Sequence, residues 1–167
     1  MVLKLTEQNN KTIFTQKIIQ TIIDDMQKSK KTAAALKCAD NKNLQYKCQE
    51  YFVRKKFFSL FQANLSLIYY TIVASLSKSK VEQDGTLKFG EALAKCAFNI
   101  DKINKLLSCN SVKELCGNLK SILSIINSKK INLQFSSLLL DCCLFNTTKR
   151  RLEVKTRWLQ QYIHHNH

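Results

Sequence analysis

The chain of 167 residues contains no proline and has glycine at only three positions, Gly85, Gly90 and Gly117. Proline ends or kinks a helix, and tight hairpins between strands depend on glycine and related residues at their turns. The scarcity of both residues allows long helices and disfavours a sheet of short strands. No alternation of apolar and polar residues runs long enough to predict a sheet. We therefore predict an all-α fold.

Apolar residues recur at intervals of three and four along most of the chain, as on the buried face of an amphipathic helix. Ser111 and Glu114 form the pattern of a capping box, with the hydroxyl on the third amide and the carboxylate on the first. Asn99 and either Thr147 or Thr148 are expected to cap two further helices. The predicted helices, about eight or nine, cover 12–29, 32–39, 44–61, 65–77, 87–98, 100–108, 112–126, 135–145 and 148–164.

A polar stretch over 78–86, which contains Gly85, is the best candidate for a boundary between two parts of the chain. We predict two small packed helical bundles, an N-terminal lobe over 1–82 and a C-terminal bundle over 86–167. The longest apolar run, 65–76, has about half of the roughly 20 residues that a membrane-spanning helix needs. We interpret it as a buried core helix.

The chain carries 27 lysine and arginine residues against 12 acidic residues, a net charge of +15. Residues 1–85 have 14 basic and 7 acidic residues, and residues 86–167 have 13 and 5, so both halves are basic. A disordered basic arm would concentrate the excess, whereas a folded basic surface spreads it. An AT-rich genome explains the preference for lysine over arginine, but it does not explain the shortage of acids. The charge favours polyanionic partners, either nucleic acid or an anionic membrane.

Seven cysteines are present, an odd number, and several lie on apolar helical faces. The N-terminus has no apolar stretch of the kind found in secretory signals. We predict reduced, buried thiols and a cytoplasmic protein. The cysteines are Cys38, Cys48, Cys96, Cys109, Cys116, Cys142 and Cys143.

No motif in the sequence predicts catalysis. His164, His165 and His167 lie at the extreme C-terminus, where a metal site or a catalytic geometry is hard to hold. Adjacent Asp24 and Asp25 are typical of a solvated helix end, and no phosphate-binding loop or dinucleotide fingerprint occurs. We expect no enzyme activity, no metal and no cofactor.

Basic residues gather at the predicted breaks between helices. One cluster alone is typical of a solvated helix end, but the recurrence at successive breaks favours contact with phosphates. Arg150 and Arg151 lie at a helix start, where the dipole disfavours cations and a phosphate would offset this. Most aromatic residues have core spacing, so we expect electrostatic tracking rather than base stacking. The candidate nucleic-acid-binding residues are Lys30, Lys31, Arg54, Lys55, Lys56, Lys102, Lys105, Lys129, Lys130, Lys149, Arg150 and Arg151, with Lys28 beside the first pair.

Five short motifs follow one another in a characteristic order. They are a small-residue helix at 33–38, Leu-x-Phe-Gly-x-Ala-Leu-Ala at 87–94, Leu-Leu-Ser at 106–108, Leu-Leu-x-Asp at 138–141, and a closing Arg157, Trp158 and Tyr162. Together they resemble the CasB family, the small subunit of the type I-E CRISPR surveillance complex, Cascade. The likeness covers most of the chain and its second half best.

The resemblance implies two packed helical bundles and a subunit that is not an enzyme, because catalysis in Cascade belongs to a helicase-nuclease recruited later. It implies two copies of the chain beside other Cascade subunits. The family's basic faces line the guide RNA–target heteroduplex and the displaced strand of the target DNA. The resemblance adds Lys37 to the candidate nucleic-acid-binding residues and supports Lys102 and Lys105. Cys38 replaces a second basic residue, and lysine lacks the bidentate phosphate recognition of arginine.

Three other functions are compatible with the sequence. The small subunit of a type III CRISPR complex is also helical and basic, and it would require an RNA target rather than a DNA duplex. A helical adaptor or effector from a lysine-rich genome would bind its partner even after nuclease treatment. A peripheral membrane protein would bind liposomes in proportion to their anionic lipid.

Overall fold

A computed structural model describes residues 2–57 and 63–166. Within these residues the chain forms nine α-helices and no strand beyond an isolated bridge between Leu87 and Leu133, which confirms the all-α prediction. The helices are α1 (Val2–Lys28), α2 (Lys30–Lys37), α3 (Gln45–Arg54), α4 (Ala63–Ser79), α5 (Phe89–Lys95), α6 (Ile100–Leu107), α7 (Val112–Ser128), α8 (Phe135–Leu144) and α9 (Thr148–His165).

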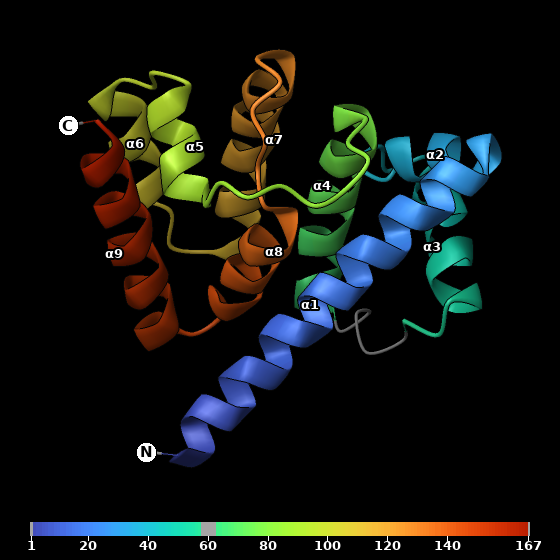
Figure 1. Ribbon diagram of the computed structural model, residues 1–167, viewed down its shortest axis with the longest axis horizontal. Coiled ribbons are helices and arrows are strands. Elements are labelled where there is room, and N and C mark those ends of the chain that lie inside the picture. The colour runs from blue at the N-terminus through green and yellow to red at the C-terminus, as the bar shows by residue number, and fades with distance from the viewer. Residues whose placement is uncertain (1, 58–62, 167) are drawn as a thin grey trace.

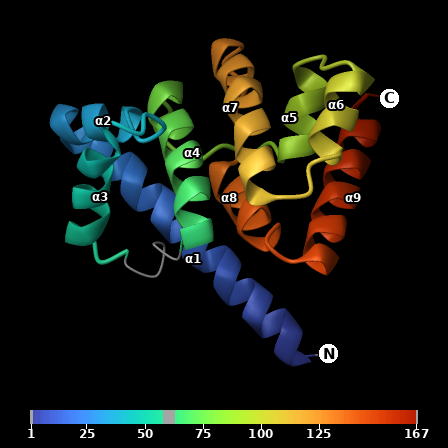
Figure 2. The same cartoon turned by 180° about the vertical axis from the view of Figure 1, so that it is seen from behind.

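The helices are arranged around a central pair, α4 and α7, which pack against each other (Figure 1). Helices α5, α6 and α9 lie on one side of this pair, and α2 and α3 lie on the other (Figure 2). The long helix α1 runs diagonally across the molecule and packs on α8 and α2. Contacts between α4 and α7 and between α1 and α8 therefore join the two halves of the chain. Its division into two lobes near residue 85 stays a prediction.

The core is built from the apolar faces that the sequence pattern indicated. Helix α4 is buried along residues 68–77, which confirms the buried core helix expected from the apolar run. Helix α8, which is apolar nearly all round, packs on α1, α4 and α9 and is central. In α1, Ile18 and Ile22 are fully buried, but Phe14 is 46% exposed and does not continue the core face. Among the described helices, none combines the length and apolarity that crossing a bilayer requires.

Two helix boundaries differ from the predicted ones by more than three residues. Helix α1 begins at Val2, ten residues before the predicted start, and only Ser29 separates it from α2. The Ser29 hydroxyl accepts a hydrogen bond from the Thr32 amide, so a single capping residue redirects the chain. Helix α3 ends at Arg54 rather than near residue 61, and Lys56 follows with a left-handed φ of 58°. Phe58 and Phe61, at the end of the helix predicted over 44–61, lie outside the described residues.

Local capping is predicted well but not in every detail. The side chain of Asn99 accepts from the Lys102 amide and caps α6, as expected. The Ser111 hydroxyl accepts from the Glu114 amide, but the Glu114 carboxylate accepts from the Asn110 amide, one residue earlier than a capping box requires. Thr147 occupies the N-cap of α9 without a side-chain hydrogen bond to the helix, so α9 is not held by a threonine cap.

The backbones of helices α5 and α9 come into close contact at Gly90, because this residue has no side chain. A Cβ atom at Gly90 would lie 2.3 Å from the Trp158 carbonyl oxygen and 2.6 Å from the Gln161 Cβ. The Gly90 amide instead donates a hydrogen bond of 3.1 Å to the Gln161 side chain. Beyond the end of α5, the Tyr162 hydroxyl donates to the Phe98 carbonyl over 2.7 Å. These contacts fix the position of α9.

Candidate nucleic-acid interface

The first basic region lies where α1, α2 and α3 meet. The clusters around Lys28 and Arg54 are 26 residues apart in sequence, yet both contribute to the lining of one pocket of about 300 Å³, together with Lys55. Lys30 and Lys31 begin α2 beside this pocket, and both side chains are exposed. The fold therefore unites two of the predicted clusters into one basic surface.

Lys55 is only partly available to an external anion because it pairs with Asp25. Its Nζ lies 2.7 Å from Asp25 Oδ2, and the Tyr51 hydroxyl donates to the same oxygen over 2.8 Å. Burial alone would raise the pKa of Asp25, but hydrogen bonds from Lys55 and Tyr51 and the charges of Lys55 and Lys28 outweigh it, so its pKa lies below the ordinary value. Asp25 is therefore ionised and shielded, with its side chain only 18% exposed, and is not the solvated residue expected at a helix end.

A basic residue that the sequence reasoning missed, Lys47, lies on α3 and lines a second, larger pocket between α2 and α3. Lys31 and Arg54 line the same pocket. The spacing of Lys47, Tyr51 and Arg54 by four and three residues was the signal for one helical face. Lys37 lies in the last turn of α2 and Lys56 follows α3, and both are exposed.

The second basic region surrounds the turn between α5 and α6. The Lys129 Nζ donates to the Cys96 carbonyl over 2.7 Å, and the Lys102 Nζ lies 5.4 Å from the centre of the Phe98 ring. Because Cys96 is the C-cap of α5, Lys129 satisfies a carbonyl at a helix end, where a cation is favourable. Its neighbours Lys105 and Lys130 are exposed.

The third basic region is the start of α9. Arg150 Nη1 lies 3.4 Å from Glu153 Oε2 in an exposed pair, which contributes little to stability. Arg151 donates from Nε to the Phe145 carbonyl over 3.2 Å, and its guanidinium lies 5.4 Å from the Phe145 ring centre. The unfavourable position expected for Arg151 at a helix start is thus offset, because its charge also stands at the C-terminal end of α8. Lys149 beside them is exposed.

The three regions do not merge into a single compact site. The first lies at the α2–α3 side of the molecule, the second at the α5–α6 turn and the end of α7, and the third at the connection from α8 to α9 (Figures 1 and 2). A surface of this kind suits a long polyanion better than a small anionic ligand, because its cations are spread over the length of the molecule.

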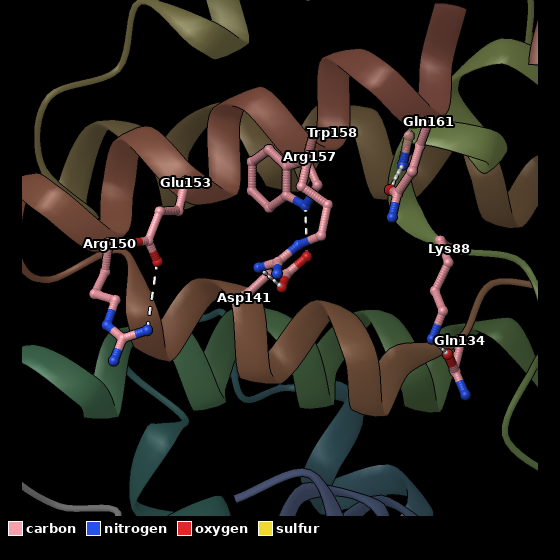
Figure 3. Close-up of polar contacts among 9 residues, drawn as sticks. Lys88, Gln134, Asp141, Arg150, Glu153, Arg157, Trp158 and Gln161 are labelled. Carbon is pink, nitrogen blue, oxygen red and sulfur yellow. Dashed lines mark hydrogen bonds and ion pairs between the residues drawn. The ribbon is translucent and has the colours of Figure 1, made fainter. Parts of the chain in front are cut away.

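A buried carboxylate fixes the direction of α9 and hence the place of its basic start (Figure 3). Asp141 Oδ1 lies 2.6 Å from Arg157 Nη2, and Asp141 Oδ2 accepts from Trp158 Nε1 over 2.7 Å. Burial raises the pKa of Asp141, and Arg157 and Trp158 offset this only in part. A further hydrogen bond joins Lys88 to Gln134 across the same region. Two of the sequence motifs, the aspartate at 141 and the pair at 157–158, therefore meet as one contact between α8 and α9.

The cysteines are free and mostly buried, as predicted. Burial raises the pKa of Cys48 to about 12 and the pKa of Cys116 and Cys143 to about 11, so these thiols stay protonated at neutral pH. No group of three or more His, Cys, Asp or Glu residues in 2–57 and 63–166 is close enough to hold a metal ion. His164 and His165 are exposed at the end of α9, and His167 lies outside the described residues.

The fold and the charge distribution define a small, basic, all-helical protein with many of its cations at helix ends. Residues 25–162 match the family model of CRISPR-associated protein Cse2, and the chain therefore belongs to this family. Cse2, also called CasB, is the small subunit of the type I-E Cascade complex, so the resemblance drawn from the sequence motifs is confirmed. The family is a structural one that associates with other Cascade subunits, which favours type I-E over the type III alternative. Searches of curated proteins and of solved structures gave no match.

Proposed function

We propose that this subunit stabilises the R-loop by holding the phosphate backbones of the guide RNA–target DNA heteroduplex and of the displaced DNA strand. Two copies in each cytoplasmic Cascade particle would bring a charge of +30 beside these strands, twice the +15 of one chain. Exchange of a DNA duplex for an RNA–DNA heteroduplex is nearly balanced in energy, so backbone contacts of modest strength decide whether the open state persists.

The observation that carries the proposal is the number of exposed cations without an acidic partner at helix ends. Within the described part of the chain these side chains form no ion pair: Lys30, Lys31, Lys37, Lys56, Lys105, Lys130 and Lys149. An exposed cation without an acidic partner meets a phosphate without first breaking an ion pair, and the contact releases a counterion from the nucleic acid. Such contacts are independent of base sequence, which suits a subunit that serves every guide.

The test uses assembled Cascade that carries Lys149→Glu together with Arg150→Glu, with Arg151 left in place because it also holds the end of α8. We expect target DNA to bind about tenfold more weakly near 0.15 M salt. The slope of log affinity against log salt should become shallower by about 0.7–0.9 for each phosphate that the variant no longer neutralises. Filter binding at several salt concentrations measures both quantities.

The matched control is Lys17→Glu with Lys113→Glu, which makes the same charge change on exposed residues outside the three basic regions. It should alter the salt slope much less than the variant at the start of α9. Equal slopes for the unchanged complex and for the Lys149 and Arg150 variant would contradict a phosphate contact there.

A further inference from the structure

The pocket between α2 and α3 has a chemical character that backbone tracking alone does not explain. Its volume of about 460 Å³ lies in the range of roughly 300–1,000 Å³ that is typical of small-ligand pockets. Part of its wall is apolar, formed by Ala34, Ala35, Cys38 and Tyr46. The cations that line it are Lys31, Lys47 and Arg54. An apolar wall with an exposed tyrosine ring beside several cations fits a ligand that is both aromatic and anionic.

Tyr46 is the residue that sets this pocket apart. It lies in the first turn of α3 and is 60% exposed, in contrast to Tyr51 further along the helix, which is 2% exposed and donates its hydroxyl to Asp25. The Lys47 Nζ lies 5.9 Å from the centre of the Tyr46 ring. The core therefore uses Tyr51 and leaves the ring of Tyr46 open to solvent beside a cation.

The surroundings of the pocket carry a net positive charge. Glu50, which lines the pocket, lies 3.9 Å from Arg54 in an exposed and weak pair, and Asp25 of the smaller pocket is already neutralised by Lys55. Lys31 and Lys47 have no acidic partner among the described residues. An anion that enters here meets attraction without displacing a strong internal ion pair.

We propose that this pocket holds one unpaired base of the displaced DNA strand, stacked on Tyr46, with the flanking phosphates on Lys31 and Arg54. The inference rests on the proposed function and names the strand that this part of the surface binds. Every base has a π-face, so the site accepts any sequence. A base of the heteroduplex is paired and cannot enter, whereas a base of the displaced strand leaves its stack at small cost.

Cys38 provides a probe inside the pocket because it is half-buried in the pocket wall. The full chain is alkylated with N-ethylmaleimide, and modification is followed by peptide mass spectrometry alone and with saturating oligo-dT. We expect the rate at Cys38 to fall at least about fivefold. Cys143 on α8, which burial keeps protonated, should stay unmodified with and without the strand and so report that the chain remains folded. A strand of abasic sites of the same length, and duplex DNA, should bind without protecting Cys38. Equal protection by the abasic strand would overturn the base-binding pocket.

The second arm replaces Tyr46 by alanine or phenylalanine and measures a dT strand that contains one 2-aminopurine. The unchanged chain and Tyr46→Phe should quench the fluorophore, whereas Tyr46→Ala should lose the quenching and bind about tenfold more weakly. The salt slope should stay the same because tyrosine carries no charge. Phe14→Ala, at another exposed aromatic, is the matched control and should have no effect. Circular dichroism checks that each variant is folded.

The outcomes separate this inference from the proposed function. If Tyr46→Ala binds and quenches like the unchanged chain, and the salt slope is normal, the pocket proposal is wrong and backbone binding stands. If the unchanged chain, alone and in assembled Cascade, binds no strand at any salt concentration, the proposed function fails and this inference fails with it.

Discussion

Asp25 and Asp141 are bound by the same kinds of partner, yet they differ in depth. Asp25 accepts from Tyr51 of α3 and pairs with Lys55 at the end of that helix, whereas Asp141 accepts from Trp158 and pairs with Arg157 of α9. The Asp25 side chain is 18% exposed and its pKa is lowered, while the Asp141 side chain is 7% exposed and its pKa is raised.

The difference shows that burial rather than the choice of partners decides the sign of the pKa shift. For Asp25 the hydrogen bonds and charges outweigh burial, so the ion is favoured at the edge of the basic pocket. For Asp141 burial outweighs a cation at 2.6 Å and an indole N–H at 2.7 Å. The shallow carboxylate modulates the charge of a surface, and the deep one holds two helices together.

The largest effect should come from removing the deep carboxylate. Asp141→Ala leaves the Arg157 guanidinium and the Trp158 N–H without their acceptor between α8 and α9. We expect the free energy of unfolding to fall by about 3 kcal/mol, the lower end for a broken buried pair, because Arg157 is 38% exposed. Urea denaturation measures it. Asp24→Ala, next to Asp25, is the control. An equally small loss of unfolding free energy in both variants would show that the contact of Asp141 with Arg157 and Trp158 does not hold α9.

The next effect concerns the close approach of α5 to the helix that Asp141 fixes. Gly90→Ala places a Cβ 2.3 Å from the Trp158 carbonyl oxygen, so α5 and α9 must separate, at a cost of about 1–3 kcal/mol. Gly117→Ala is the matched control, because a Cβ there meets no atom within 4 Å. In the exposed interior of α7 it should stabilise the protein by about 0.5–1 kcal/mol. Thermal unfolding of both variants measures the expected loss of stability for Gly90→Ala and the expected gain for Gly117→Ala. Losses of equal size in the two variants would contradict the close approach of α5 and α9.

The shallow carboxylate should matter less for stability and more for binding. Asp25→Ala leaves the Tyr51 hydroxyl without an acceptor, and we expect a loss of about 1–2 kcal/mol in the free energy of unfolding. It also frees Lys55, so the affinity for single-stranded DNA should rise and the salt slope should steepen by about 0.7, the value for one phosphate.

The control is Asp24→Ala. It removes the same charge from the adjacent residue, whose carboxylate accepts from the Gln20 side chain, and it frees no lysine. Titration of an oligo-dT strand at several salt concentrations compares the two variants. Identical slopes for Asp25→Ala and Asp24→Ala would show that Lys55 does not reach the strand.

The smallest effect is the opposite pH dependence of the two sites. Because folding lowers the pKa of Asp25, its contribution to stability is complete above its unfolded pKa near 3.8 and is lost as the pH falls through the lower folded value. Folding raises the pKa of Asp141, so its contribution declines as the pH rises from 3.8 through the raised value. The unchanged chain should be more stable than Asp25→Asn by an amount that shrinks towards acid pH. Its stability advantage over Asp141→Asn should shrink as the pH rises. Urea unfolding from pH 3 to 7 measures both, and parallel curves would contradict the difference in depth.

The helical class, most of the helices and their buried faces could be predicted from the amino-acid sequence. Periodicity and capping depend on residues within one or two turns, so Asn99 as a cap and the buried face of α7 were readable from local spacing. The free, buried cysteines and the excess of positive charge in both halves follow from composition in the same way. The order of five motifs was sufficient to indicate the family that the match over 25–162 established.

Which of these residues meet depends on tertiary packing. Packing brought the clusters at Lys28 and Arg54 to one pocket, paired Lys55 with Asp25, and left Tyr46 exposed. It also engaged the side chains of Lys129 and Arg151 with backbone carbonyls, which no local pattern indicates. Helical spacing shows which side chains share a face, but their partners belong to other helices. The charge and depth of each site are therefore set by contacts between residues far apart in the chain.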